Sequence, residues 1–364
     1  MIHRPFQVEV PVPNGCANES IIKRYRNQSQ MGFPPQYLIC LPNAKCYGGG
    51  FVQIHNGQFL VESAWRLNPF LGSESYKTWF RRHRVRLEGD YYHLRTFWGS
   101  NYGHWLYEDL PRLLSALPYL PEKIKFLVPD NIESWRLESL YALGIEESQF
   151  HRIQSYMEAD CERLWFATEL GSSREFYTSP DVVQKLRQLL LNHAAQFANG
   201  EDGGELPTGE RIFISRSGVG IKRLVNEDEL IEIAEKLGFT IVAPEKYSFL
   251  EQIKIFQNAN VVVGAFGAAL TNILFAKPNA IVVDLQDDIP VACPRVWYWK
   301  MAHVFGTRYK TIIGAAVSYG DWNKASFSIA PQLFSEALTE ICTAIDDPES
   351  KATDFFRSAT PSET

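Results

Sequence analysis

The chain has 364 residues, which is more than one ordinary hydrophobic core accommodates, so about two domains are expected. With 45% hydrophobic residues, 21% charged residues and a formal net charge of −6, the composition is that of a globular protein and disfavours a general nucleic-acid binder. The six cysteines are scattered without a C-x-x-C pair or a Cys/His cluster, which argues against a zinc site.

The first residues lack the charged and apolar regions of a signal peptide, and no window approaches the ~20 apolar residues of a membrane span. We therefore predict a soluble, cytoplasmic protein. The basic run RRHRVR at 81–86, next to Trp79 and Phe80, has two interpretations. It is a solvated strand or loop, or it contacts an anionic acceptor or the inner face of a membrane as a peripheral surface.

Residues 1–100 contain short alternating apolar runs between glycines and prolines, which predict a β-rich entry region. From about residue 100 the periods of helices and strands alternate, and a segment rich in glycine and acidic residues at 198–210 reads as a linker. The expected elements are a helix at 103–117, a strand at 123–129, a helix at 131–144, a strand at 163–168 and a helix at 179–197.

After the linker the alternation becomes regular and is typical of a parallel, doubly wound sheet. The expected elements are strands at 211–215, 240–244, 260–264 and 280–285, and helices at 226–238, 248–259 and 268–276. The predicted fold is α/β with domains at 1–200 and 207–330, a helix at 331–346 that packs back on the N-terminal domain, and a frayed tail at 347–364. Two α/β units joined by a linker imply a cleft between them, with ligands outside the carboxyl ends of the strands.

Two arginines flank a glycine-containing loop between a predicted strand and the next helix. Arg216 and Arg223 suit bidentate phosphate recognition, with the helix N-terminus adding amide donors. The alternative is a pair of surface arginines that form ion pairs with the acidic residues of NEDE at 226–229. Glu245 follows the next strand, where it could accept hydrogen bonds from ribose hydroxyls or remain a solvated turn carboxylate.

The stretch GAFGAALTN at 264–272 follows a third strand. Gly264 and Gly267 could offer backbone donors to an anion, or they could merely turn the chain. Thr271 and Asn272 could approach the same ligand or bond local backbone. The chain contains no D-x-D triplet of the kind that holds a cation on a nucleotide diphosphate. Charge neutralisation would then fall to arginines and helix dipoles.

The N-terminal half contains the unusual stretch WGSNYGHWLYEDLPRLL at 98–114. On a helix, His104 and Glu108 share one face, as do Trp105 and Asp109. A histidine beside a carboxylate can form a general base with an orienting partner. It also resembles half of a metal site, but no third ligand follows at helical spacing. The alternative is a partly buried histidine hydrogen-bonded to its carboxylate, with the tryptophan in the core.

These motifs, in this order, resemble glycosyltransferase family 61, known from capsule and exopolysaccharide assembly and formerly a domain of unknown function. NYGHWLYEDLPRL is similar to the family signature N-x-x-H-W-x-x-D-x-L-P-x-L. VNEDELIEIAEKLGF and PEKYSFLEQIKIFQNANVVVGAFGAALTN are similar to its R…N-E block, its P-E…S-x-x-E-Q block and its G-x-H-G-A-G-L-T-N turn. The resemblance covers residues ~95–290.

The resemblance implies a B-type fold in which two Rossmann-like domains face a cleft. It further implies an inverting, metal-independent transfer from a nucleotide sugar to a saccharide or lipid-linked saccharide, with no cofactor. Glu108 would be the base, oriented by His104, and Asp109 is a further catalytic candidate. The donor-binding residues would be Arg216, Arg223, Asn226, Glu245, Gly264, Phe266, Gly267, Thr271 and Asn272, with both arginines neutralising the diphosphate.

Two positions depart from the family pattern. Phe266 replaces its histidine, and Ala269 replaces its second glycine. The loss of a polar donor either alters the donor pocket or marks a degenerate member that binds a saccharide or nucleotide without catalysis. A nucleotide-linked hydrolase or epimerase on the same scaffold is a weaker alternative.

Overall fold

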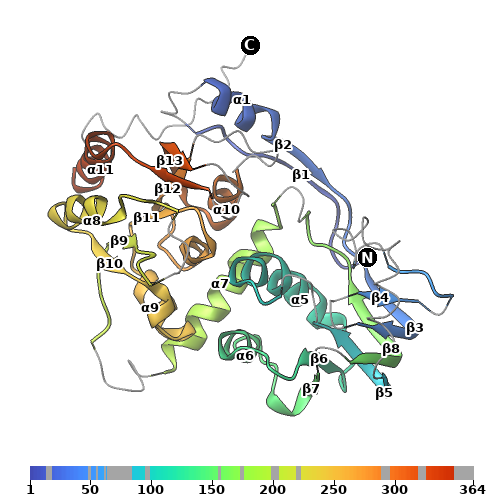
Figure 1. Ribbon diagram of the computed structural model, residues 1–364. Coiled ribbons are helices and arrows are strands. Elements are labelled where there is room, and N and C mark those ends of the chain that lie inside the picture. The colour runs from blue at the N-terminus through green and yellow to red at the C-terminus, as the bar shows by residue number, and fades with distance from the viewer. Residues whose placement is uncertain are drawn as a thin grey trace. The chain divides into compact units, whose positions relative to one another are not determined.

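A computed structural model describes residues 1–13, 19–47, 51–54, 56–60, 63, 84–94, 99–154, 157–172, 176–197, 205–218, 223–287, 296–318 and 325–347 (Figure 1). The chain divides into two compact units. The first unit holds Met1–Phe6 and Phe33–Leu190; the second holds Gln7–Gly32 and the described residues from Leu191 onward. The first unit differs from the expected N-terminal domain at 1–200 mainly because Gln7–Gly32 belongs to the second unit. The tail expected at 347–364 lies, apart from Asp347, outside the described residues.

The first unit is built on a six-stranded mixed sheet of order β4-β3-β8-β5-β6-β7. Neighbours among β8, β5, β6 and β7 are parallel, whereas β3 is antiparallel to both β8 and β4. The strands are β3 (Leu38–Cys46), β4 (Val52–Gln53), β5 (Arg84–His93), β6 (Lys125–Pro129), β7 (Phe150–Ile153) and β8 (Glu158–Ala167). The helices are α4 (Tyr102–His104), η1 (Trp105–Asp109), α5 (Leu110–Ala116), η2 (Leu117–Tyr119), α6 (Ser134–Tyr141), η3 (Glu147–Gln149) and the first part of α7 (Pro180–Ala195).

The β-rich start of the chain is present, although a helix interrupts it. Strands β1 (Phe6–Glu9) and β2 (Gln30–Phe33) form a two-stranded sheet that contains the borders between the units, and α1 (Glu19–Asn27) lies between them in sequence. In the first unit, one face of the six-stranded sheet is apolar. Leu87, Tyr91, Leu127 and Leu164 meet there in a buried cluster, as the period-2 alternation of half-buried strands requires.

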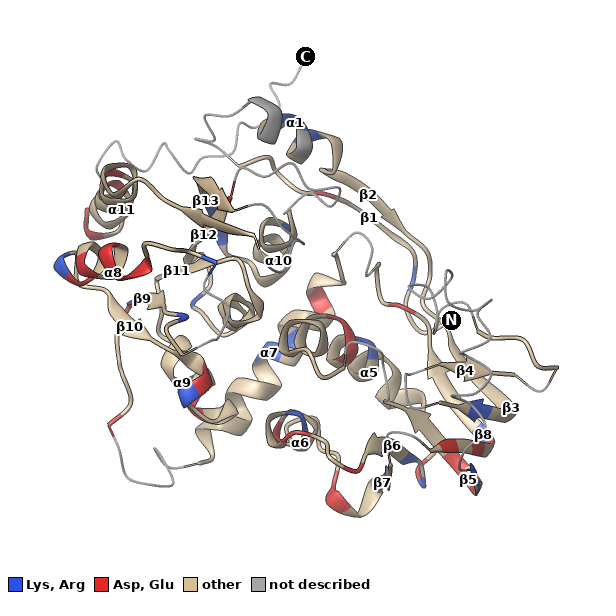
Figure 2. Ribbon diagram, viewed as in Figure 1, with Lys and Arg blue, Asp and Glu red and all other residues tan. Residues whose placement is uncertain are grey.

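The basic run at 81–86 enters the described chain only at Arg84, so its first three residues, like Trp79 and Phe80, lie outside the described residues. Nε of Arg84 lies 2.9 Å from the Glu158 carboxylate, and Nη1 of Arg86 lies 2.8 Å from that of Asp160. Figure 2 shows charges of both signs where β3, β5 and β8 lie together. Both arginines therefore form ion pairs with acidic residues of the neighbouring strand β8, as expected for a solvated strand.

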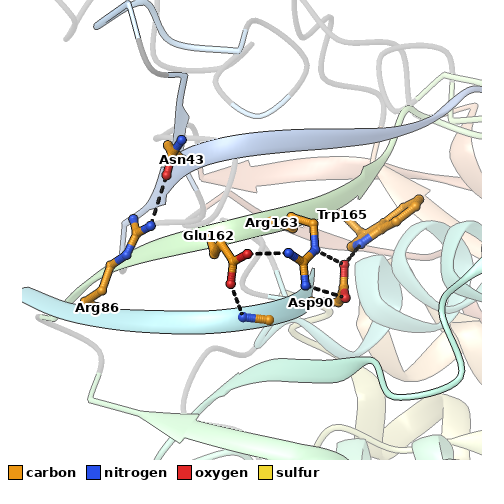
Figure 3. A network of polar contacts seen from close by, with 7 residues as sticks. Asn43, Arg86, Asp90, Glu162, Arg163 and Trp165 are labelled. Atoms are coloured by element: carbon orange, nitrogen blue, oxygen red, sulfur yellow. Dashed lines mark hydrogen bonds and ion pairs between the residues drawn. The ribbon is translucent and has the colours of Figure 1, made fainter.

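A bulge in β5 carries a network of polar contacts (Figure 3). Gly89 supplies the left-handed backbone of the bulge at φ 98°, and its amide donates to Glu162 at 2.8 Å. Arg163 donates twice to Asp90, at 2.8 and 3.0 Å, and also contacts Glu162. The indole of Trp165 donates to Oδ1 of Asp90 at 2.8 Å, the oxygen that also accepts from Nε of Arg163.

Replacing Asp90 with Asn is expected to lower stability in a pH-dependent way. The hydrogen bond from Arg163 holds the pKa of Asp90 below its ordinary value, against partial burial. A depressed folded pKa contributes stability that is fully present above the unfolded pKa of ~3.9, and this contribution is lost progressively as the pH falls from that value through the lower folded pKa. Because Arg163 is exposed to solvent, we expect a cost of at most about 1 kcal/mol at pH 7 that shrinks towards pH 3, measured by urea unfolding. Asp130→Asn, at an exposed turn, is the control; an equal cost at both pH values would contradict the prediction.

The second unit is built on a six-stranded sheet of order β10-β9-β11-β12-β13-β14. The first five strands are parallel and β14 is antiparallel, so the predicted parallel, doubly wound sheet is confirmed. The strands are β9 (Arg211–Ile214), β10 (Thr240–Val242), β11 (Val261–Ala265), β12 (Ile281–Asp287), β13 (Arg308–Ser318) and β14 (Ser326–Ser328). The helices are α8 (Glu227–Lys236), η4 (Pro244–Lys246), α9 (Phe249–Phe256), η5 (Ala268–Leu274), α10 (Trp297–Phe305) and α11 (Pro331–Asp346).

Helices cover both faces of this sheet. Val261, Val263 and Ile281 face a core that contains residues of α8 and α11, including Phe334 and Leu338. Helices α9 and α10 both contact η5. The predicted helix at 331–346 is confirmed, and its apolar residues lie in the core of the second unit; its packing on the N-terminal domain stays a prediction.

Candidate active site

The second unit has a topological switch point at the carboxyl ends of β9 and β11. From β9 the chain passes through α8 to β10 on one side, and then through α9 to β11 on the other. The two loops diverge there, and ligands of open α/β sheets bind in the crevice that results. The residues at these two strand ends are Ser215–Gly218 and Phe266–Ala269.

Arg216 is held by its backbone rather than by an ion pair. The buried carboxylate of Glu227, in the first turn of α8, accepts from the amide of Arg216 and from Oγ of Ser215, both at 2.7 Å. The guanidinium of Arg216 lies over Gly267, where any Cβ would collide with its Nη1. Its Nε has no hydrogen-bond partner among the described residues. The guanidinium thus lies at the turn after β11 and is not paired with the acidic side chains at 227–229.

Arg223 reaches the same turn from the loop that precedes α8. Its Nη1 lies 3.4 Å from the carbonyl oxygen of Phe266, and its guanidinium carbon lies 5.9 Å from the centre of the Phe266 ring. The ring is only 5% exposed and packs against Trp297 and Tyr298 at 5.2 and 5.3 Å. Phe266 is therefore part of an aromatic cluster, and its ring offers little surface to a ligand.

The turn presents three backbone amides. Those of Gly267, Ala268 and Ala269 donate to no described residue, and all three residues are half-exposed. The carbonyl oxygen of Gly267 accepts from the amide of Leu270 at 2.9 Å and from the hydroxyl of Tyr298 at 2.6 Å. Together with the two guanidinium groups, these amides make a concentrated set of donors for an anion.

The remaining donor-side candidates occupy different places. Glu245 in η4 is exposed, and its carboxylate lies against Gly218 in the loop after β9, where it would collide with any Cβ. Asn226 bonds the backbone of Ile329 in both directions, at 2.9 and 3.2 Å, and so ties the start of α8 to the chain after β14. Its role in donor binding stays a prediction.

Gly264, Thr271 and Asn272 are buried. A Cβ at Gly264 would come within 3.2 Å of Ile214, so this glycine permits close packing of β11 on β9. Asn272 donates to the side chain of Gln252 in α9 at 3.0 Å. These residues support the turn from beneath, which leaves Gly267 as the predicted glycine on its accessible side.

In the first unit, β5 and β8 are parallel neighbours, and the segment that contains His104 and Glu108 follows β5 in sequence. The chain after β5 leads to Asn101, whose side-chain oxygen accepts from the amides of Gly103 and His104 at 3.0 and 3.3 Å. This is the N-cap of the segment that was expected to be one helix at 103–117. The His104–Glu108 segment therefore follows the carboxyl end of β5 in sequence, and ligands of parallel sheets bind outside such strand ends.

The expected helix is interrupted by a π-helical turn, η1. The amide of Leu110 donates to the carbonyl of Trp105, five residues back. Pro111 has no amide to donate and its ring would crowd the preceding turn, which accounts for the widening. Such turns recur at functional sites. Nδ1 of His104 lies 3.1 Å from Oε1 of Glu108, an ion-pair distance whose angles do not meet those of a hydrogen bond.

His104 and Glu108 remain accessible while their neighbours are buried. Their side chains are 13% and 20% exposed. Trp105 donates to Oγ of Ser139 at 2.9 Å and lies under the guanidinium of Arg136 at 4.2 Å. Tyr107 donates to the carbonyl of Phe176 at 3.0 Å. These anchors fix the backbone, so the two polar side chains can act as a general base and its orienting partner.

Asp109 faces away from that role. Its buried carboxylate accepts from Arg112 at 2.7 Å, and the two form an ion pair one turn apart. Burial opposes the charge of Arg112, yet the carboxylates of Asp109, Glu169 and Glu108 keep its pKa above the ordinary value. The structure gives Asp109 a fold role, and its catalytic role stays a prediction.

Three residues of these sites have weak sequence signals. Arg112 lies within the quoted signature, but nothing local shows that it is buried. Glu227 could be read as a solvated helix-start acid, and α8 is strongly acidic along its exposed side (Figure 2). Tyr298 reaches the turn from α10, and no local sequence signal indicates a contact with Gly267, which lies 31 residues earlier in the chain.

The model of the family described as Glycosyltransferase 61 matches residues 102–283, half of the chain. The chain belongs to glycosyltransferase family 61. The matched segment of this family 61 protein contains the His104–Glu108 pair, both arginines and the turn after β11. The resemblance drawn from the motifs is confirmed.

Named relatives match over shorter segments. Xylan glycosyltransferase MUCI21 of Arabidopsis thaliana is 33% identical over 99 residues, 26% of this chain and 19% of that protein. The EGF domain-specific O-linked N-acetylglucosamine transferase of Drosophila melanogaster is 31% identical over 93 residues, 25% of this chain and 17% of that protein. The rice beta-1,2-xylosyltransferase XAX1 (Oryza sativa subsp. japonica) is 32% identical over 111 residues, 30% and 19% of the two chains. The match spans about a fifth of the length of these relatives.

Among the described residues, no group of three or more His, Cys, Asp or Glu side chains is placed to hold a metal ion. No helix in that part of the chain combines the length and the apolar character needed to cross a bilayer.

Proposed function

We propose that this family 61 protein is an inverting, metal-independent glycosyltransferase. It moves a sugar from a nucleotide-sugar donor to a hydroxyl of a saccharide or lipid-linked saccharide, in surface polysaccharide biosynthesis in the cytoplasm. The two units are proposed as the acceptor-side and donor-side domains of a B-type fold. The observation that carries the proposal is the donor set at the β9–β11 switch point, where two guanidinium groups meet the amides of three half-exposed residues that donate to no described residue.

The chemistry divides between the two units. Glu108, oriented by His104, takes the proton of the acceptor hydroxyl as its oxygen attacks the anomeric carbon. The bond from that carbon to the diphosphate oxygen breaks, and the nucleoside diphosphate leaves with the electron pair. Arg216, Arg223 and the amides of the turn stabilise the negative charge that develops, without a cation being required. Attack opposite the leaving group inverts the anomeric configuration.

The nucleoside is placed by the neighbouring strand. Glu245 follows β10, the strand beside β9, and an acid at that position of a doubly wound sheet accepts from ribose hydroxyls. Among donors, those carrying xylose and N-acetylglucosamine are the first to test, because the named relatives include a xylosyltransferase and an N-acetylglucosamine transferase.

Replacing Arg216 or Arg223 with Ala is expected to weaken nucleoside diphosphate binding by about tenfold or more. Each removes charge-assisted hydrogen bonds worth about 1.5–3 kcal/mol. Isothermal titration of UDP and GDP measures the change. The control is Lys277→Ala, which removes an exposed cation paired with Glu210 near the amino end of β12. Unchanged affinity in both arginine variants would refute the donor assignment.

A second function is favoured by one observation. Phe266 occupies the position where the family pattern has a histidine. Its ring is buried against α10 and does not face the half-exposed side of the turn. A degenerate member would bind nucleotide through its arginines and backbone but not transfer sugar. UDP or GDP binding combined with no donor hydrolysis or transfer, over a panel of donors and acceptors, would support this second function.

A further inference from the structure

Helix α10 controls the orientation of a peptide group in the turn after β11. The Tyr298 hydroxyl, in the first turn of α10, donates to the carbonyl oxygen of Gly267 at 2.6 Å. In a trans peptide the carbonyl and the following N–H point in opposite directions. With the carbonyl of Gly267 drawn towards α10, the amide of Ala268 points away from it, on the half-exposed side of the turn.

The preceding peptide is set in the same manner. Its carbonyl, on Phe266, faces Nη1 of Arg223 at 3.4 Å, so the amide of Gly267 points away from that guanidinium. The Phe266 ring lies edge-on to Tyr298 at 5.3 Å, and this contact holds the phenol in place. Two consecutive carbonyls are thus bonded to side chains, and two consecutive amides are left for an anion.

Tyr298 keeps the proton that it donates to Gly267. It is 4% exposed, and burial, with Asp284 acting in the same direction, raises the pKa of its hydroxyl above the ordinary value, against a hydrogen bond from Thr271 and the charges of Arg216 and Arg223. The phenol therefore keeps its proton at any working pH and adds no negative charge beside the arginines.

The other side of α10 is braced by the N-terminal segment Gln7–Gly32. The indole of Trp299 donates to the carbonyl of Pro11 at 2.8 Å, and the ring of Tyr25 lies edge-on to it at 4.7 Å. Tyr25, in α1, is itself 1% exposed. This segment precedes the residues matched by the family model, yet it belongs to the second unit and fixes the helix that carries Tyr298.

We propose that Tyr298 is a positioning residue for the diphosphate of a nucleoside diphosphate, acting through the Gly267 peptide, and that the N-terminal segment braces it through Trp299. The inference rests on the proposed function for the identity of the anion. It adds a residue on α10 and a segment outside the matched region to the machinery that holds the donor.

Tyr298→Phe tests the proposal, because it removes one hydroxyl and keeps the ring packed on Phe266. We expect the Kd values of UDP, GDP and inorganic pyrophosphate to rise together by about three- to tenfold, the effect of one lost hydrogen bond. The KM for the sugar donor should rise by a similar factor. Trp299→Phe, which loses the bond to Pro11, should raise the same Kd values by a smaller factor, and it serves in place of Tyr298→Phe should that variant not fold.

The matched control is Tyr47→Phe in the first unit, which loses a hydroxyl bond of 2.7 Å to Gln53. It should lower the melting temperature without changing any Kd. Wild-type Kd values in Tyr298→Phe, with only a lower melting temperature, would overturn the positioning role and leave the proposed function intact. A wild-type protein that binds neither nucleotide nor pyrophosphate would instead refute the proposed function, and this inference with it.

Discussion

Glu108→Gln is expected to lower kcat by about 10²- to 10⁴-fold, the usual contribution of a positioned general base. The substitution keeps the shape of a side chain that lies 3.1 Å from Nδ1 of His104, but an amide cannot take the proton of the acceptor hydroxyl. The affinity for UDP or GDP should not change, because the arginines and the turn that are proposed to bind the diphosphate belong to the second unit. Initial rates of sugar transfer, together with titration calorimetry of the nucleotide, measure both quantities.

Two further variants make this test specific. Glu122→Gln changes an exposed carboxylate near the end of the same helical region and should leave kcat at the wild-type value. His104→Ala removes the orienting partner and should lower kcat less than Glu108→Gln does, since the base itself remains. A Glu108→Gln enzyme with full transfer activity would exclude this residue as the base. The pair would then be interpreted as a support for the π-helical turn.

Local signals are enough to predict the regular parts of this fold. The strand at 260–264 and the helix at 248–259 are read from periodicity and from the capping box of Ser248 and Glu251, and both are present. The same signals place Arg216 and Arg223 at a strand end and a helix start, which is why the donor side could be proposed from sequence. That both reach the turn at Gly267 follows from the strand order, which periodicity does not give.

Features that depend on contacts distant in sequence could not be predicted. Asn226 has the sequence position of a helix cap, but its amide is used 103 residues away, on Ile329. The sequence of Gln7–Gly32 predicts only short strands. The segment belongs to the second unit, where Tyr25 packs against Trp299, and no local signal indicates this contact. In the signature motif, helical periodicity treats Glu108 and Asp109 as equivalent carboxylates. Only burial separates an accessible residue beside His104 from one paired with Arg112.

The buried ion pair between Asp109 and Arg112 gives the largest expected change in stability. Arg112→Met should lower the free energy of unfolding by about 3–5 kcal/mol, as breaking a buried ion pair does when one charge is left behind. Methionine keeps most of the volume of the buried side chain. The carboxylate of Asp109, whose side chain is 8% exposed, would then lie without its cation, and Glu108 and Glu169 would lose their attraction to the Arg112 charge. Urea unfolding at pH 7, followed by tryptophan fluorescence, measures the loss.

The double variant Arg112→Met/Asp109→Leu decides between the two roles of Asp109. Replacing both members of a buried ion pair with apolar side chains of similar size is often neutral, so the double variant should recover most of the stability lost in Arg112→Met. If Asp109 serves the fold alone, the recovered protein should also retain transfer activity, because Glu108 and His104 remain anchored by Trp105 and Tyr107. A stable double variant whose kcat falls as far as that of Glu108→Gln would restore Asp109 to the catalytic residues. A double variant no more stable than Arg112→Met would show that the ion pair is not what holds this segment.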